Sequence, residues 1–231
     1  MVDFDDSNYE FVAVVGPSGC GKTTLLNMMA GLLPSTSGEI QFQGKRLEGP
    51  HQEIGIVFQR PVLLPWRRIV DNVMLPVEVM NLRPREEYRR RTQELLEMVG
   101  LQGFEHAYPQ ELSGGMQQRA AIARALVYDS KLLLMDEPFA ALDALTREEM
   151  NMELLRIWDL TKKAVVFVTH NIPEAVLLSD RIVVMTARPG KVREIIEVDL
   201  PRPRSLSLMG NPRFGELADH IRSLFKAAKP A

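Results

Sequence analysis

Two glycine-rich stretches of this sequence could each bind a phosphate group. The first, GPSGCGKT at residues 16–23, has the spacing G-x-x-x-x-G-K-[ST] and lies between the strand-like run FVAVV and the helix-forming run TLLNMMAGLL. In such a loop backbone N–H groups surround the phosphates, Lys22 reaches the β- and γ-phosphates, and the Thr23 hydroxyl binds Mg²⁺. A glycine-rich turn with a chance lysine is the alternative, but it does not account for the flanking strand and helix. The candidate ATP-binding residues are Gly16, Pro17, Ser18, Gly19, Cys20, Gly21, Lys22, Thr23 and Thr24.

An acidic pair follows a second apolar run, in KLLLMDEP at residues 131–138. Asp136 is the candidate for holding Mg²⁺, and Glu137 is the candidate for polarising the water that attacks the γ-phosphate. Strand ends also carry Asp or Glu simply as helix caps, which is the alternative. In a chain that already has a phosphate-binding loop, we favour the catalytic interpretation.

Two further polar side chains end apolar runs. Gln59 follows IGIVF, and His170 follows VFVT. Ligands bind at the carboxyl ends of the strands in α/β sheets, so we expect both residues near the first loop and the acidic pair. Gln59 would offer an amide oxygen to the metal and the water, and His170 would contact the γ-phosphate. A lone histidine is usually structural, so the argument depends on the four groups occurring together.

The second glycine-rich stretch, ELSGGMQQRAAIARAL at residues 111–126, leads from a polar turn into a segment with helical propensity from Gln117 to Leu126. Bare amides at a helix N-terminus form an anion site. One ATP needs only one phosphate-binding loop, so the second site needs an explanation of its own.

Composition limits the classes of protein to consider. The 231 residues are 45% hydrophobic and 25% charged with a net charge of −2, which is ordinary for a globular protein and gives no basic footprint for nucleic acid. One cysteine cannot form an internal disulfide, which fits a reducing compartment. No apolar run approaches the roughly 18 residues of a membrane span, and the start VDFDD does not resemble a signal peptide. We therefore expect a cytosolic protein that docks on an embedded partner if it works at a membrane.

Short apolar runs with helical segments between some of them predict an α/β fold with buried parallel strands. Residues 39–44 and 194–200 alternate polar and apolar, which predicts half-exposed strands. The runs predicted to be buried strands are Phe11–Val15, Ile54–Phe58, Leu132–Met135, Val165–Thr169 and Ile182–Met185.

The middle of the chain predicts helices instead. In the segment that follows residue 82, five residues share one helical face and Gly100 stands where a helix would end. We expect one domain over residues 1–231, with a core at 1–64 and 129–200, a helical subdomain at about 65–128 and a tail at 201–231. The tail ends in a possible amphipathic helix, Phe214–Phe225. The five residues of the shared face are Tyr88, Thr92, Leu95, Leu96 and Val99.

Taken together, GPSGCGKT, Gln59, LSGGMQ, LLLMDEP, ALD at residues 141–143 and His170 resemble the nucleotide-binding subunit of an ATP-binding cassette (ABC) transporter. The order and spacing match over nearly the whole chain. The resemblance implies a P-loop NTPase (RecA-like) core with a mostly parallel sheet, a small antiparallel β-lobe and a helical subdomain. It also implies an ATPase that drives transport, with Glu137, His170 and Gln59 as catalytic residues and Thr23, Gln59 and Asp136 around Mg²⁺.

The resemblance also explains the second anion site. In this family two subunits pair head to tail, and each ATP lies between one P-loop and the partner's LSGGMQ-type signature. Ser113, Gly114 and Gly115 would therefore contact the γ-phosphate that a second copy binds, and Asp143 would lie at the same interface.

A membrane partner is implied in the same way. The segment 60–73, RPVLLPWRRIVDNV, is unusually apolar for a loop and includes Trp66. Ordinary packing between lobes is one interpretation, whereas the resemblance favours a groove for a cytoplasmic helix of a permease, which would hold the chain at the cytoplasmic face of the membrane. LLPWRRIVDNV, EAVLLSDRIVVMTARPGKV and DLPRPRSL resemble importer subunits for nitrate, sulfonates and taurine. In those importers the permease and a solute-binding protein choose the solute.

The sequence departs from the family pattern near its start. Gly16 comes only 15 residues after the first residue, so we expect the first strand of the β-lobe to be missing, and neither Phe4 nor Tyr9 sits where the family places its adenine-stacking aromatic. Base stacking on an aromatic ring contributes roughly 1–3 kcal/mol, so weak ATP binding is expected. A second departure is Ala140, which stands where members of the family commonly have serine.

Two alternatives belong to other classes. A soluble ABC ATPase of DNA repair or translation would show a long coiled-coil insertion or two cassettes, with basic surfaces, and neither is present. A non-hydrolysing binding module is the second, because a missing start would spoil the nucleotide site. The intact Lys22, Asp136, Glu137 and His170 argue against an evolved loss of activity.

Overall fold

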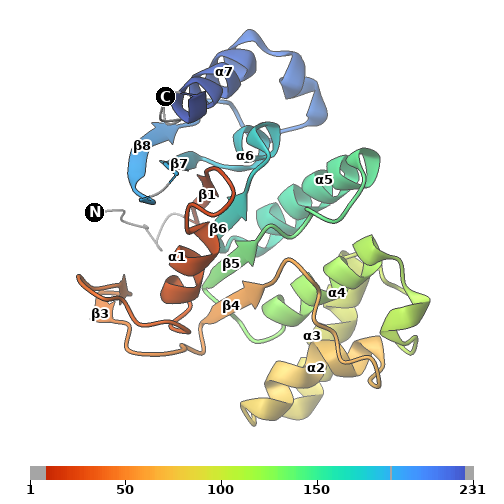
Figure 1. Ribbon diagram of the computed structural model, residues 1–231. Helices are drawn as coiled ribbons and strands as arrows, with labels where there is room; N and C mark the ends of the chain where they lie inside the picture. The colour runs from red at the N-terminus through yellow and green to blue at the C-terminus, as the bar shows by residue number, and fades with distance from the viewer. Residues whose placement is uncertain (1–8, 188, 227–231) are drawn as a thin grey trace. The chain divides into compact units, whose positions relative to one another are not determined.

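The structure is a computed structural model that describes residues 9–187 and 189–226 (Figure 1). The chain forms two compact units, which are described separately below. The first unit contains Met1–His51, Leu134–Glu137 and Lys162–Ala231. The second contains Gln52–Leu133 and Pro138–Thr161. The start of the β-lobe and Phe4 fall in residues 1–8, which lie outside the described residues.

The strands confirm the predicted α/β fold with a mostly parallel sheet. Six strands follow one another in the order β4-β5-β6-β1-β7-β8. β1 pairs in parallel with both β6 and β7, whereas β8 at the edge of the sheet pairs antiparallel with β7. Both β1 and β6 are buried along their whole length, as their continuous apolar runs predict. The strands are β1 (Phe11–Val15), β4 (Ile54–Val57), β5 (Leu132–Asp136), β6 (Ala164–Thr169), β7 (Arg181–Met185) and β8 (Val192–Glu197).

The expected strand at residues 39–44 is shorter than predicted. It forms only β2 (Gln41–Phe42), which pairs with β3 (Lys45–Arg46) in a two-stranded antiparallel sheet. Gln43 and Gly44 have φ values of 52° and 70°, so the two residues form the tight turn of this hairpin rather than extending the strand.

Helices of the first unit pack around its part of the sheet. They are α1 (Lys22–Met29), α6 (Ile172–Leu178) and α7 (Pro212–Lys226), with a short 3₁₀ segment η2 (Leu206–Gly210). α6 packs on β1 and α7 packs on α6. The buried residues of α7 include Phe214, Leu217 and Ile221, which confirms the predicted amphipathic helix near the end of the chain.

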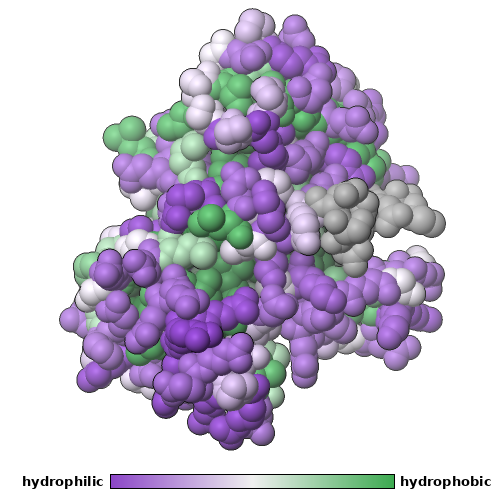
Figure 2. All heavy atoms as spheres, turned by 180° about the vertical axis from the view of Figure 1, so that it is seen from behind, coloured by the Kyte–Doolittle hydropathy of each residue, from purple (hydrophilic) through white to green (hydrophobic). Residues whose placement is uncertain are grey.

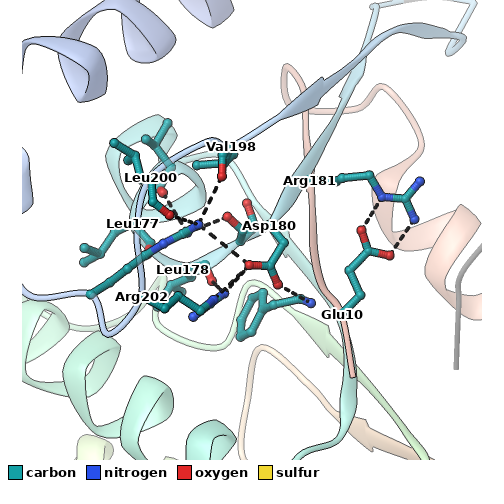
Figure 3. Close-up of polar contacts among 12 residues, drawn as sticks. Glu10, Leu177, Leu178, Asp180, Arg181, Val198, Leu200 and Arg202 are labelled. Carbon is teal, nitrogen blue, oxygen red and sulfur yellow. Dashed lines mark hydrogen bonds and ion pairs between the residues drawn. The ribbon is translucent and has the colours of Figure 1, made fainter. Parts of the chain in front are cut away.

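Arg202 and Arg204 bind the segment after β8 to the corner between α6 and β7, and Figure 3 labels Arg202 beside Asp180 there. Arg202 donates to Asp180 Oδ1 at 2.9 Å, and Asp180 Oδ2 accepts the backbone N–H of Phe11 at 2.9 Å. Arg204, only 5% exposed, donates to carbonyl oxygens of Val176, Leu177, Ser179, Val198 and Leu200. Burial lowers the pKa of Arg204 to about 10, which still leaves it charged at neutral pH.

The second unit is mainly helical. Its helices are α2 (Ile69–Val79), α3 (Arg85–Met98), η1 (Pro109–Glu111), α4 (Gly114–Leu126) and α5 (Ala144–Thr161). α4 packs against α2 and α3. In α3, Thr92, Leu95 and Leu96 are buried, and Gly100 has a φ of 66°, as the predicted face and helix end require.

The surface carries single exposed apolar side chains among many hydrophilic ones. The face drawn in Figure 2 is mostly purple, with smaller green groups of hydrophobic residues. Trp66 is 71% exposed and Val79 is 76% exposed, both in the helical unit. Among the described helices, none combines the length and apolar character needed to cross a membrane.

Candidate functional site

The first glycine-rich loop joins β1 to α1, as predicted. Gly19 and Gly21 have φ values of 75° and 98°, a backbone region that favours glycine, and the chain enters α1 directly after Gly21. Lys22 is only 5% exposed, and its ammonium group donates to the carbonyl oxygens of Gly16 at 2.9 Å and Pro17 at 3.3 Å. The loop therefore curves around the lysine head group, which places a positive charge where a phosphate-binding loop needs one.

Thr23, the residue after Lys22, is hydrogen-bonded to Asp136 at the end of β5. The Thr23 hydroxyl donates to Asp136 Oδ1 at 3.1 Å. Burial raises the pKa of Asp136 above its ordinary value, and the hydrogen bond from Thr23 opposes this shift. No group of three or more His, Cys, Asp or Glu side chains suited to a metal exists within the described ranges. The Thr23 hydroxyl and the Asp136 carboxylate are oxygen groups that could hold Mg²⁺ together with phosphate oxygens, because Mg²⁺ prefers oxygen ligands and keeps several waters.

Glu137 lies between two nitrogen groups. Its Oε2 is 2.9 Å from Nδ1 of His170, and its Oε1 is 3.7 Å from the ammonium group of Lys22. The backbone of Glu137 has a φ of 43°, and its N–H donates to the Val168 carbonyl at 2.9 Å. A non-glycine residue in this region is uncommon and is typical of functional sites, where surrounding contacts hold it. Here the neighbouring strand β6 holds it.

The structure thus brings together five of the predicted residues at the ends of β1, β5 and β6 in the first unit: Lys22, Thr23, Asp136, Glu137 and His170. A carboxylate, an imidazole, an ammonium group and a hydroxyl–carboxylate pair converge there. These groups can bind phosphate and a divalent cation, and they can take a proton from an attacking water.

The other predicted residues belong to the second unit. Gln59 is exposed and follows β4 after one intervening residue. Ser113 caps α4 by accepting the Met116 N–H at 3.3 Å, so the helix begins at Gly114, earlier than its propensity from Gln117 predicts. The serine cap supplies the reason, because it satisfies an N–H group that would otherwise be unpaired.

Within this unit Thr146 links Asp143 to the Ser-Gly-Gly turn, because it bonds to Asp143 and packs beside Gly115. Asp143 accepts the Thr146 N–H at 3.1 Å and the Thr146 hydroxyl at 2.7 Å, and these bonds lower the pKa of Asp143. A Cβ added to Gly115 would come within 3.4 Å of Thr146. The start of α4 and the start of α5 are therefore packed together, with Ser113, Gly114 and Asp143 exposed.

Sequence reasoning missed the residues that fix both sides of His170. Glu174 is 4% exposed and accepts a hydrogen bond from the Thr169 hydroxyl. Thr169 Oγ1 in turn accepts the Asn171 N–H at 3.0 Å, and Asn171 Oδ1 accepts the Glu174 N–H at 3.1 Å. The spacing Asn-x-x-Glu at a helix start is a capping signal that could have revealed this network.

Side chains of α4 hold the segment that contains Gln59. Gln118, 2% exposed, donates to the Phe58 carbonyl at 3.2 Å. Arg124 donates to the Pro61 and Val62 carbonyls, each at 2.8 Å. Val62 has a φ of 47°, which is unfavourable for a β-branched residue, so Arg124 stabilises a strained backbone. The helix that starts at the signature therefore holds the backbone on both sides of Gln59.

We expect Gln118→Leu to lower the free energy of unfolding by about 1–3 kcal/mol, because it leaves the Phe58 carbonyl without its amide donor. Urea or thermal unfolding would measure this. The matched control is Gln102→Leu, at an exposed position, which should unfold like the unmodified chain. Equal stability of the two variants would show that the bond to Phe58 contributes little.

Adenine recognition is not explained by the described aromatics near the start. Tyr9 is 49% exposed and has a φ of 49° just before β1. Phe4, the other aromatic considered, lies outside the described residues. The prediction of weak ATP binding remains a prediction.

Comparison with known proteins identifies the family. A family model described as ABC transporter matches residues 1–140. The taurine import ATP-binding protein TauB of Rhizobium johnstonii is 45% identical over 99% of this chain and 88% of its own length. The aliphatic sulfonates import ATP-binding protein SsuB of Bacillus cereus is 47% identical over 88% of this chain and 80% of its own length. An uncharacterized ABC transporter ATP-binding protein of Methanocaldococcus jannaschii is 54% identical over 84% of this chain and 73% of its own length.

Solved structures agree with the sequence relatives. The dimeric structure of a post-hydrolysis state of the ATP-binding cassette MJ0796, bound to ADP and Pi, matches with a TM-score of 0.72 and 34% identity over 87% of this chain and 89% of that chain. A structure of cbiO1 from Clostridium perfringens, part of the ABC transporter complex cbiONQ, matches with a TM-score of 0.75 and 30% identity over 83% of this chain and 78% of that chain. The chain therefore belongs to the ABC transporter family, as an ATP-binding and ATP-hydrolysing subunit.

Proposed function

We propose that this chain powers an importer for a small anion or organic solute of the nitrate, sulfonate or taurine kind. ATP would join two copies head to tail, and hydrolysis would let them part. The observation that carries the proposal is the cluster of Lys22, Asp136, Glu137 and His170 at one end of the first unit's strands. The names of the taurine and sulfonate relatives support the substrate class.

Each residue of the cluster has a task in the proposed reaction. Lys22 exchanges its loop carbonyl partners for β- and γ-phosphate oxygens. Thr23 and Asp136 would hold Mg²⁺, with Gln59 offering a further oxygen, and the bound ion would neutralise charge on the phosphate oxygens. Glu137 accepts a proton from the attacking water while the bond between the γ-phosphorus and the ADP oxygen breaks. His170 holds the Glu137 carboxylate from Nδ1 and contacts the γ-phosphate.

A second copy would supply the rest of each nucleotide site. Ser113, Gly114 and Gly115 lie at the start of a 13-residue helix, where unpaired N–H groups and the helix dipole favour an anion. We propose that they contact the γ-phosphate bound by the partner copy, and that Asp143 lies at the same interface. The dimeric state of MJ0796 in its ADP- and Pi-bound structure supports this pairing.

The membrane partner would be a permease, and a solute-binding protein would deliver the solute to it. We propose that the segment 60–73 docks on the permease, with Val62 and Trp66 as its exposed apolar side chains. Such docking would place the chain at the cytoplasmic face of the membrane. The names of the import relatives and the net charge of −2 give no support to a nucleic-acid-binding ABC ATPase.

Mixing two inactive variants tests the shared sites directly. Lys22→Ala removes the phosphate-binding ammonium, and Ser113→Asp places a negative charge where the partner's γ-phosphate would lie. Aspartate is itself a good N-cap, so Ser113→Asp should leave α4 intact. Each variant alone should have almost no ATPase activity. An equal mixture should recover about a quarter of the wild-type rate, because half of the dimers are mixed and each of these has one complete site.

The control is the double variant Lys22→Ala/Ser113→Asp mixed with wild type. In that pairing each shared site of the mixed dimer contains one defect, so the mixture should show only the activity of its wild-type dimers. If the two single variants, both folded, show no recovery when mixed, the head-to-tail arrangement is wrong for this chain.

A further inference from the structure

The turn between β7 and β8 contacts the phosphate-binding loop at very short range. A Cβ added to Gly190 would lie 2.0 Å from the carbonyl oxygen of Cys20 and 3.2 Å from its carbonyl carbon. A Cβ added to Gly16 would lie 3.0 Å from the Met185 carbonyl oxygen at the end of β7. The end of β7 thus lies against the start of the loop and the turn lies against its middle, and only a residue without a side chain fits at Gly190.

Thr186 fixes the shape of this turn. Its hydroxyl accepts the Lys191 N–H at 3.2 Å and donates to the Pro189 carbonyl at 3.1 Å, and its own N–H donates to the Lys191 carbonyl at 2.9 Å. Gly190 lies between Pro189 and Lys191, so these bonds hold it in place against Cys20. These contacts give Thr186 and Gly190 a structural role that the catalytic cluster does not explain.

The contact between Gly190 and Cys20 can affect phosphate binding because it acts on the Cys20–Gly21 peptide group. The carbonyl of Cys20 and the N–H of Gly21 belong to the same planar peptide group, so moving one re-aims the other. Gly21 has a φ of 98° and is followed at once by Lys22, the first residue of α1. A shift of the Cys20 oxygen would therefore disturb the backbone that surrounds the phosphates.

We propose that Gly190 is a positioning residue for ATP: the β7–β8 turn holds the Cys20–Gly21 peptide so that its N–H faces the phosphates. The inference rests on the proposed assignment of residues 16–23 as the phosphate-binding loop. It gives the turn a role in nucleotide affinity rather than in the chemical step, since the turn touches neither Glu137 nor His170 in any described contact.

The test is Gly190→Ala. The Cys20 oxygen would have to move by about 1 Å to regain even a 3.0 Å separation from the new methyl group. We expect the KM and Kd for ATP to rise about tenfold or more, because misplacing a binding group by about 1 Å is costly. The kcat should stay within about twofold, since an N–H that binds the phosphates equally before and during reaction affects KM and not kcat.

Gly210→Ala is the matched control, because Gly210 has open space at the Cβ position and no unusual φ, and its KM should not change. Thr186→Val is the second variant: it loosens the turn without adding bulk and should raise KM by a smaller factor. A Gly190→Ala chain with wild-type KM, or with reduced kcat at unchanged KM, overturns the inference. If wild type itself neither binds nor hydrolyses ATP, the proposed function fails instead.

Discussion

Replacing Glu137 by glutamine should reduce ATP hydrolysis by about 10²- to 10⁴-fold, the range that a positioned general base contributes. The amide has nearly the same shape as the carboxylate but cannot accept a proton from water. Glutamine can keep a hydrogen bond to His170 Nδ1, which is 2.9 Å from the carboxylate, because the imidazole tautomer can adjust. ATP binding should therefore survive, and with Mg²⁺ the bound nucleotide should hold two copies together.

Two measurements separate these effects. Phosphate release gives the rate, and size-exclusion chromatography with light scattering gives the fraction of dimer at saturating ATP. Glu197→Gln is the control, since it removes an exposed carboxylate from β8 in the same unit and should change neither quantity. A Glu137→Gln chain that hydrolyses ATP normally would assign the base to another residue. One that is inactive but stays monomeric with ATP and Mg²⁺ would argue against the ATP-joined dimer.

Some parts of the site could be predicted from the sequence because their chemistry is local. The loop at residues 16–23 needs particular glycines, one lysine and one threonine at fixed spacing, and the flanking strand and helix follow from neighbouring residues. Asp136, Glu137 and His170 follow continuous apolar runs, and parallel strands bring such ends to one edge of a sheet. Their convergence was therefore predictable without any knowledge of the individual distances.

Other contacts could not be predicted because they join positions far apart along the chain. Nothing near Gly190 shows that it faces Cys20, since that approach depends on the β7–β8 turn as well as on β1 pairing with β7. Arg204 could be read only as one of several charges in a Pro- and Arg-rich tail, whereas it is 5% exposed and bonded to carbonyls. A local pattern also gave a wrong prediction. The alternation of residues 39–44 predicted a six-residue strand, but the hairpin turn at Gln43 and Gly44 ends the strand after Phe42.

Replacing Lys22 by alanine should weaken ATP binding by about 100-fold or more, because each charge-assisted hydrogen bond to a phosphate contributes about 1.5–3 kcal/mol. The loss also removes the donor that the Gly16 and Pro17 carbonyls share, and it leaves Glu137 without the ammonium group 3.7 Å away. The phosphates and the Glu137 carboxylate would then repel one another without a cation from the loop between them.

Titration with a fluorescent ATP analogue measures the affinity, and thermal unfolding without nucleotide separates lost binding from lost folding. Lys45→Ala, at an exposed position in β3 of the same unit, is the control and should bind like wild type. The expected pattern is a folded Lys22→Ala chain whose unfolding temperature no longer rises when ATP is added, since only a ligand that binds the native state stabilises it. Undiminished stabilisation by ATP would mean that the triphosphate is held elsewhere on the chain, and the roles argued for Thr23, Asp136 and Glu137 would then have to be abandoned together with that of Lys22.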